Sequence, residues 1–203
     1  KSSLEPWDCR AVQPVKRLSG ATLGIVGLGR IGQATAQRAR AMRMRVIAYD
    51  PYLRPGTEKV FGVEMVSFEE LLSASDVVSL HTPLTNETEG LINNGAISRM
   101  KSDSILVNTS RGAVVDTLAL AHALRSGKIA GAGIDVLPIE PPPADEPLIQ
   151  LWRESEKTNL NLIITPHTAF YSAEAMLEIR TKTAMEVVRA LRGEKLINCV
   201  NSQ

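Results

Sequence analysis

Short apolar runs alternate with segments of helical periodicity from residue 22 onward. The apolar runs predict buried strands at Thr22–Val26, Arg45–Tyr49, Asp76–His81, Ser104–Asn108, Ile129–Val136 and Asn161–Thr165. The periodic segments predict helices at Ile31–Met42, Ser67–Leu72, Asn94–Met100, Asp116–Ser126 and Ser172–Arg192. Strands that are apolar throughout and separated by helices are typical of a parallel sheet covered on both faces. We therefore predict an α/β, doubly wound Rossmann fold.

Local signals refine these limits. The first predicted helix has four residues at helical spacing, namely Ile31, Thr35, Ala39 and Met42. Ser67 is the predicted N-cap of the next helix, and Glu70, three residues on, completes a capping box. The proline-rich segment Pro138–Pro147 predicts a loop, because proline lacks the N–H that a helix or a central strand needs. The charged segment Trp152–Asn159 is interpreted as a surface excursion.

Composition narrows the class of protein. A chain of 203 residues can bury one good core, and the alternating region over 20–170 is predicted to be one domain. A formal net charge of +1 gives no indication of direct nucleic-acid binding, and no apolar run of about 18 residues indicates a membrane span. Cys9 and Cys199 lie near opposite ends of the chain without metal-ligand spacing, so we expect neither a metal site nor a disulfide framework. The lack of a disulfide framework fits a reducing compartment, and we expect a cytoplasmic location. Because the chain begins with Lys1, we interpret it as a fragment or a processed chain.

The stretch "GIVGLGRIG" joins the first predicted strand to the first helix. Gly27 permits the tight turn, Gly29 lets the backbone approach a pyrophosphate, and Gly32 lets helix and strand pack closely. The helix begins at Arg30 and Ile31, where backbone N–H groups and the positive end of the dipole face the anion. This spacing indicates a dinucleotide loop, although a glycine turn without a ligand has the same pattern.

An acidic residue at the end of the second predicted strand favours the dinucleotide loop over a glycine turn without a ligand. Asp50 lies where it would accept hydrogen bonds from the adenosine ribose and repel a 2′-phosphate. We therefore predict a dinucleotide site that prefers NAD to NADP. Arg54 nearby would soften that preference, unless it is an ordinary exposed loop arginine.

Three further side chains follow three different strand ends, where ligands of open α/β sheets bind. Arg111 is suited to grip a carboxylate with two hydrogen bonds, and His167 is suited to exchange a proton near neutral pH. Glu140 would hold the tautomer of the histidine. Taken singly, each has an ordinary structural role as an alternative. Together, beside a dinucleotide loop, they indicate hydride transfer.

Other residues compete for these roles. His81, also at a strand end, is a rival for the base, but it adjoins "TPLTNET", which looks like a cofactor-facing loop. His122 lies in the middle of a predicted helix and is interpreted as a surface residue. Asp135, at a strand tip, is either a hydrogen-bond acceptor for a nicotinamide carboxamide or a turn residue.

The chain resembles the D-isomer-specific 2-hydroxyacid dehydrogenases. The matching motifs are "GIVGLGRIGQ", "LHTPLT", "LVNTSRGAVVD", "GAGIDV" followed by Glu140-Pro141, and "TPHTA", in the family's order. "YDPYL", "FYS" and "NCVN" are most similar to the C-terminal-binding-protein branch, which contains corepressors and bacterial dehydrogenases. Phe170, where the corepressors carry tryptophan, and a longer segment between Glu140 and His167 depart from that branch.

The resemblance implies a role for each matching residue. Arg111 would bind the substrate carboxylate, His167 would be the acid/base and Glu140 its partner. The implied cofactor contacts are Gly27, Leu28, Gly29, Arg30, Ile31, Gly32, Asp50, Thr82, Pro83 and the loop on to Thr88, Thr109, Ser110 and Asp135.

The resemblance also implies an activity and a domain plan. The expected activity transfers a hydride between NAD(H) and a small 2-oxo or 2-hydroxy acid, and the alternative is an NAD(H)-sensing, corepressor-like binding protein. Residues 1–19 would form an interdomain and dimerisation segment, so that we expect a homodimer through the nucleotide-binding domain. Residues 171–203 would form a helix and tail that return toward a substrate domain largely absent from this chain.

Overall fold

The computed structural model describes residues 15–158 and 160–199, so most of the predicted segment 1–19 lies outside the described residues. The chain divides into two compact units, Lys1–Pro166 and His167–Gln203. The strands of the first unit are β1 (Thr22–Val26), β2 (Arg45–Tyr49), β3 (Glu64–Met65), β4 (Val77–Leu80), β5 (Ile105–Asn108), β6 (Gly131–Ile134) and β7 (Leu162–Ile164). Its α-helices are α1 (Arg30–Ala41), α2 (Thr57–Phe61), α3 (Phe68–Ala74), α4 (Asn94–Arg99), α5 (Thr117–Arg125) and α6 (Pro147–Thr158).

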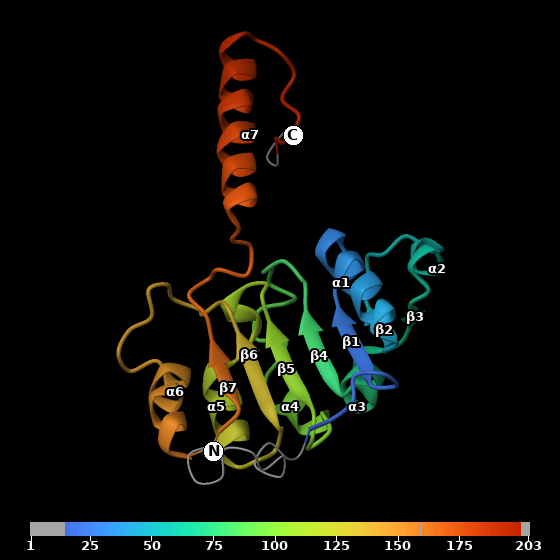
Figure 1. The fold of residues 1–203 in the computed structure, drawn as a ribbon, viewed down its shortest axis with the longest axis vertical. Helices are drawn as coiled ribbons and strands as arrows, with labels where there is room; N and C mark the ends of the chain where they lie inside the picture. The colour runs from blue at the N-terminus through green and yellow to red at the C-terminus, as the bar shows by residue number, and fades with distance from the viewer. Residues whose placement is uncertain (1–14, 159, 200–203) are drawn as a thin grey trace, which may run out of the picture. The chain divides into compact units, whose positions relative to one another are not determined.

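The strands form one parallel sheet in the order β3-β2-β1-β4-β5-β6-β7 (Figure 1). The middle of β1 pairs on both sides, with Ile25 opposite Ala48 of β2 and Ser79 of β4. The chain therefore builds outward from β1 first in one direction and then in the other. This confirms the predicted doubly wound Rossmann fold.

Helices cover both faces of the sheet, and each face has its own core. On one face, Leu23 and Ile25 of β1 pack with Ala36 of α1. On the other face, Val26 belongs to the larger core, with Leu71 of α3 and the buried residues of α4, α5 and α6. Alternate residues of one strand thus enter opposite cores, which is why the strands are apolar throughout.

The predicted start of a helix agrees with the structure where a side chain caps the first turn. Ser67 precedes α3, and its hydroxyl accepts the Glu70 N–H at 3.2 Å, as predicted. Asp116 caps α5 in the same way through the Ala119 N–H at 3.0 Å. The short elements α2, β3 and the 3-10 turn Gly112–Val114 were not predicted.

Of the four residues noted at helical spacing along α1, only Ala39 is buried. The buried residues of this helix are Gly32, Ala36 and Ala39, whereas Ile31 is 66% exposed and Met42 is 49% exposed. Small residues face the sheet because the helix lies close to β1, and the larger apolar residues are left outside.

The segment predicted as a surface excursion from residue 152 is instead the second half of α6. Leu148 and Leu151 of this helix are fully buried in the larger core. The helix packs beside α5, to which it is also joined by an ion pair between Arg125 and Glu154 at 2.8 Å. Arg153 and Glu154, two of the charged residues that suggested an excursion, are exposed.

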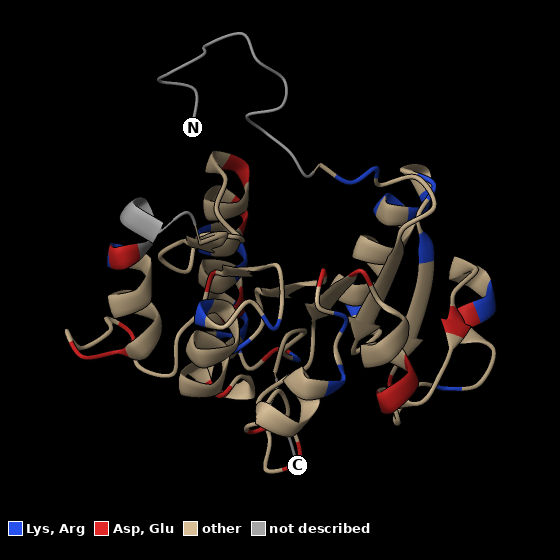
Figure 2. Cartoon of the chain, turned by 90° about the horizontal axis from the view of Figure 1, so that it is seen from below, with Lys and Arg blue, Asp and Glu red and all other residues tan. Residues whose placement is uncertain are grey.

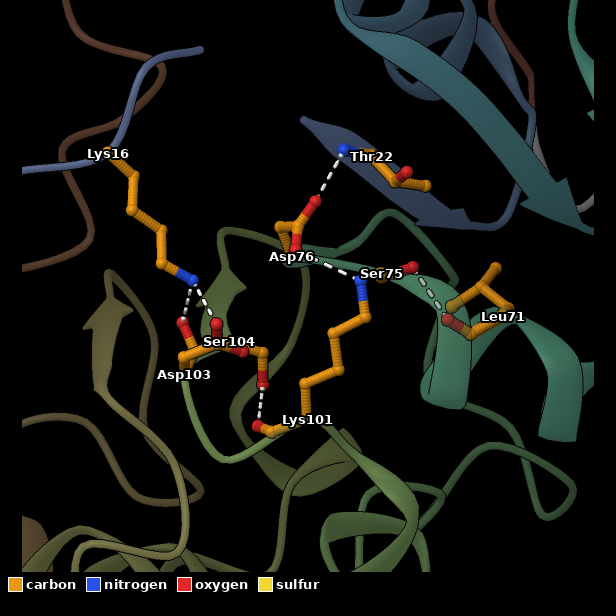
Figure 3. Close-up of polar contacts among 8 residues, drawn as sticks. All are labelled: Lys16, Thr22, Leu71, Ser75, Asp76, Lys101, Asp103 and Ser104. Atoms are coloured by element: carbon orange, nitrogen blue, oxygen red, sulfur yellow. Dashed lines mark hydrogen bonds and ion pairs between the residues drawn. The ribbon is translucent and has the colours of Figure 1, made fainter. Parts of the chain in front are cut away.

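A polar network joins the amino ends of β1, β4 and β5 (Figure 3). Asp76, just before β4, accepts the N–H of Thr22 at 2.7 Å and the ammonium of Lys101 at 3.0 Å. Lys16 pairs with the Asp103 carboxylate beside it. Burial opposes the charged form of Asp76, but the Thr22 amide and Lys101 outweigh it and lower the pKa of this carboxyl. The network lies at the amino ends of the strands, whereas the candidate site described below lies at their carboxyl ends.

Acidic and basic residues are both spread over the helices and loops of the first unit (Figure 2). Among the described residues, no helix is long and apolar enough to cross a membrane.

The second unit is built on one long helix, α7 (Ala173–Leu191), as predicted. Ser172 caps it by accepting the N–H of Ala175 at 3.0 Å. The carboxylate of Glu186 accepts the backbone N–H groups of Ile197 at 2.9 Å and Asn198 at 3.3 Å, which holds the following segment against the helix.

Candidate functional site

A pocket of about 620 Å³ lies at the carboxyl ends of β1, β2 and β4. It is lined by Gly27, Gly29, Tyr49, Asp50, Pro51, Tyr52, His81, Thr82, Pro83, Thr85, Asn86, Glu87 and Thr88. Because β2 and β4 flank β1 on opposite sides, this is the point where the strand order reverses, and where ligands of doubly wound sheets bind. Its volume is in the usual range for small-molecule and cofactor sites.

The three glycines of the loop behave differently. Gly27 has a φ of +90°, and a Cβ there would lie 2.8 Å from the carbonyl oxygen of His81. A Cβ on Gly32 would lie 2.2 Å from the carbonyl oxygen of Gly27. A Cβ on Gly29 would meet nothing within 4 Å. Two glycines are thus required by the protein's own packing, whereas Gly29 keeps a wall of the pocket open.

Asp50 is fixed beside this loop by two backbone groups. Its Oδ2 accepts the Leu28 N–H at 2.8 Å, and its Oδ1 accepts the Tyr52 N–H at 2.9 Å. The side chain of Leu28 is fully buried in the core, so its contribution is the backbone. The first turn of α1 has no acidic residue, and no side chain caps it. Its N–H groups and positive dipole end are therefore suited to an anion.

The opposite wall is the loop after β4. Thr88 Oγ1 donates to the Pro83 carbonyl at 2.6 Å and accepts the Thr85 N–H at 2.8 Å, which fixes the turn. His81 contacts Ser79 at 3.0 Å between Nε2 and Oγ, and burial lowers its pKa. The Thr82 hydroxyl oxygen is buried without a hydrogen-bond partner in the described part of the chain.

Arg111 and Glu140 lie on adjacent loops, after β5 and β6. Arg111 is exposed and donates from Nη1 to the Ser110 carbonyl at 2.7 Å. The next residue, Gly112, packs so closely that a Cβ would lie 1.9 Å from the carbonyl carbon of Leu137. Glu140 Oε1 accepts the N–H of that same Leu137 at 2.9 Å. The fold thus brings these two loops together.

The other predicted residues of the first unit lie near these strand ends. Ser110 is buried and donates from Oγ to Asn108 Oδ1 at 2.8 Å, while Thr109 beside it is exposed. Asp135 is 5% exposed, and its Oδ1 accepts the hydroxyl of Thr165 at 2.5 Å. None of the three lines the pocket described above, and neither does Arg30 or Ile31.

His167 is the first residue of the second unit and is described with it. Its φ is +53°, a region that few residues other than glycine adopt and in which histidine is enriched. The ring of Phe170 lies edge-on to the imidazole, with 6.1 Å between the ring centroids.

Sequence reasoning missed Tyr49, Pro51 and Tyr52 as lining residues of the pocket. The proximity of Pro51 and Tyr52 to Asp50 in the sequence was an available signal. Among the described residues, there is no group of three or more His, Cys, Asp or Glu side chains that could hold a metal ion.

Comparison with known proteins assigns the chain to a family. The family model for the D-isomer specific 2-hydroxyacid dehydrogenase, NAD binding domain, matches residues 4–169. The chain belongs to this family. Its Rossmann unit is therefore an NAD-binding domain, as the glycine loop and Asp50 predicted.

Relatives of the dehydrogenase family match over most of this chain. It is 47% identical over 184 residues to a glyoxylate reductase of Korarchaeum cryptofilum, a match that covers 91% of this chain and 53% of the relative. It is 41% identical to a D-3-phosphoglycerate dehydrogenase of Archaeoglobus fulgidus, covering 96% of this chain and 35% of the relative. The crystal structure of D-lactate dehydrogenase from Aquifex aeolicus, complexed with NAD and lactic acid, superposes with a TM-score of 0.80 at 38% identity. That match covers 89% of this chain and 56% of that one.

This chain thus spans about half, or less, of the length of the relatives it matches. The proteins compared carry the names of dehydrogenases and a reductase, which does not favour the corepressor-like alternative.

The residues of the pocket fit NAD. Gly29 leaves space where a side chain would otherwise stand, beside the uncapped start of α1. Asp50 is held by two N–H groups and retains carboxylate lone pairs for ribose hydroxyls. The buried hydroxyl of Thr82 has no hydrogen-bond partner among the described residues, so a ligand could supply one. These features match the phosphate, ribose and polar contacts that a dinucleotide requires.

Proposed function

We propose that the complete protein is an NAD-dependent oxidoreductase acting on a small 2-hydroxy or 2-oxo acid. One observation carries the proposal. The pocket suited to a dinucleotide and the two neighbouring loops that hold Arg111 and Glu140 lie at the same end of the sheet, where the strands have their carboxyl ends. NAD, when bound, supplies the group that accepts or donates the hydride. The names of the relatives indicate glyoxylate, lactate and phosphoglycerate as chemical models for the substrate.

Each polar residue has a distinct proposed task. The guanidinium of Arg111 binds the substrate carboxylate through two N–H groups and orients the carbonyl at C2. The imidazolium of His167 donates a proton to the C2 oxygen during reduction and accepts it during oxidation. The carboxylate of Glu140 stabilises the protonated imidazole and sets its orientation. Asp50, Thr82 and the glycine loop hold the dinucleotide.

The decisive experiment replaces the proposed acid/base in the complete protein. We expect His167→Ala to lower kcat with NADH and a panel of small 2-oxo acids by about 10²–10⁴-fold, the usual contribution of a positioned acid or base. The dissociation constant of NADH should change little, because the proposed task of His167 is proton exchange with the C2 oxygen of the substrate and not binding of the dinucleotide. His122→Ala, on the exposed side of α5, is the matched control and should keep full activity. Undiminished turnover in His167→Ala would contradict the assignment.

We further propose a cytoplasmic homodimer formed through the nucleotide-binding domain. The family resemblance supports the dimer, and two cysteines near opposite ends of the sequence, which do not form a disulfide framework, fit a reducing compartment. Sedimentation equilibrium of the complete protein tests the dimer directly, and a monomer at micromolar concentration would exclude it.

A further inference from the structure

A hydrogen bond crosses the dinucleotide pocket between two loops that are distant in sequence. The hydroxyl of Tyr52, in the loop after β2, donates to the carboxylate of Glu87, in the loop after β4. Both residues line the pocket. We propose that this pair is a clasp that positions the Tyr52 ring as a wall of the adenosine subsite before the cofactor arrives.

The position of the Tyr52–Glu87 pair indicates that it contacts the adenosine half of the cofactor. Tyr52 donates its backbone N–H to Asp50 Oδ1, so the clasp begins at the residue that marks the adenosine ribose. Arg111 and Glu140, proposed for the substrate, do not line this pocket. The clasp therefore acts on the adenosine half of the dinucleotide, and it rests on NAD binding rather than on the proposed reaction.

Both ends of the clasp are anchored by backbone contacts. On one side, Asp50 fixes the Tyr52 backbone and is itself fixed by Leu28. On the other side, Glu87 lies within the turn closed by the Thr85 N–H and the Thr88 hydroxyl, which are 2.8 Å apart. The bond between the two side chains thus joins two fixed loops rather than two free surface groups.

The exposure of Tyr52 argues for a ligand rather than a core contact. The residue is 76% exposed, although a tyrosine ring is largely apolar. Its hydroxyl is held by Glu87, which leaves an oriented aromatic face next to the pocket, suited to a planar base. Donation to the Glu87 carboxylate raises the pKa of Tyr52, so the hydroxyl keeps its proton and remains a donor at neutral pH.

Preorganisation gives the expected size of the effect. Ordering a long side chain during binding weakens affinity, so two side chains already held in place favour the complex. We expect Tyr52→Phe and Glu87→Ala each to raise the dissociation constant of NADH by about 3- to 10-fold. Because both break the same bond, the double variant should be little weaker than either single variant. Glu87→Gln, which keeps an acceptor for the hydroxyl, should recover part of the affinity.

The test measures binding of NADH and of ADP-ribose to the full chain by fluorescence titration and calorimetry. ADP-ribose lacks the nicotinamide, so a clasp on the adenosine half predicts equal losses for the two ligands. Glu64→Ala is the matched control, because Glu64 is an exposed carboxylate that accepts a hydrogen bond from Arg45 at 2.6 Å but does not line the pocket. Thermal unfolding of each variant confirms that it is folded.

Unchanged affinity in both single variants would overturn the proposal. So would losses that add in the double variant, or a loss for NADH that ADP-ribose does not share. The test measures binding and not turnover. A negative result for the clasp would therefore not contradict the proposed reaction, and the clasp can be tested even if the protein shows no turnover.

Discussion

Two alanine substitutions in the glycine loop should separate packing from cofactor binding. A Cβ on Gly32 would lie 2.2 Å from the Gly27 carbonyl oxygen and 3.2 Å from Ile25 Cγ2. Carbon and oxygen atoms normally approach to about 3.3 Å, so helix and loop must separate by about 1 Å. Overpacking of this kind costs about 1–3 kcal/mol, against a gain of at most about 1 kcal/mol from the helix propensity of alanine. We expect Gly32→Ala to lower the free energy of unfolding by about 1–2 kcal/mol and to weaken NADH binding.

Gly29→Ala is the counterpart in the same loop. Gly29 has a φ of −72°, which alanine adopts easily, and its Cβ would meet nothing within 4 Å. Gly29 is also the N-cap of α1, where alanine is less favourable than glycine, so the free energy of unfolding should fall by at most about 1 kcal/mol. The methyl group would instead narrow the approach of the pyrophosphate, and we expect the dissociation constant of NADH to rise about tenfold or more.

Urea denaturation and NADH titration of both variants provide the assay. The reasoning fails if Gly32→Ala is as stable as the wild type, or if Gly29→Ala is destabilised while its NADH affinity is unchanged. Either result would mean that the two glycines do not have the separate roles that their surroundings indicate.

Further predictions concern the core and the dependence of stability on pH. Leu151→Ala, at a fully buried position of α6, should lower the free energy of unfolding in urea by about 2–5 kcal/mol, whereas the half-exposed neighbour Trp152→Ala should cost less. The lowered pKa of Asp76 stabilises the fold above the unfolded pKa of about 3.9, so the stability lost in Asp76→Asn should shrink as pH falls through the folded pKa. His81 has a folded pKa below its unfolded value of about 6.5, so its burial destabilises the fold as pH falls below 6.5. His81→Gln should flatten that part of the profile, and an unaltered slope would exclude His81 as its source.

Six of the seven strands of the described residues could be predicted from the sequence, because a sheet covered on both faces favours apolar residues at most positions, whereas the two-residue β3 is too short to show a pattern. The helix α6 could not be predicted, because Leu148 and Leu151 lie next to a proline-rich loop and are outnumbered by charged neighbours. The buried side of α1 could not be predicted from helical spacing either, since only Ala39 of the four spaced residues is buried. Close approach to β1 selects small residues such as Gly32 and Ala36, so size rather than hydrophobicity decides which residues face inward.

Part of the candidate site could likewise be predicted from the sequence, and part could not. Gly27, Gly29 and Asp50 follow a fixed local spacing, which is why the sequence indicates them and the pocket contains them. Tyr52 and Glu87 are 35 residues apart, and the pairing of β2 and β4 on either side of β1 is needed to bring them together. Contacts of this kind follow from the order of strands, which the sequence pattern does not specify position by position.

The edges of the sheet have a consequence for self-association. The outermost strands are very short, with two residues in β3 and three in β7. At the β3 edge, Glu64 also forms an ion pair with Arg45 at 2.6 Å. A strand added by another molecule would find few consecutive N–H and C=O groups to pair with, and a charged pair beside them. Parallel sheets form slowly through distant contacts, and their exposed edges are prone to aggregate during that time. The short outer strands thus limit growth of this sheet into larger β assemblies once the chain has folded.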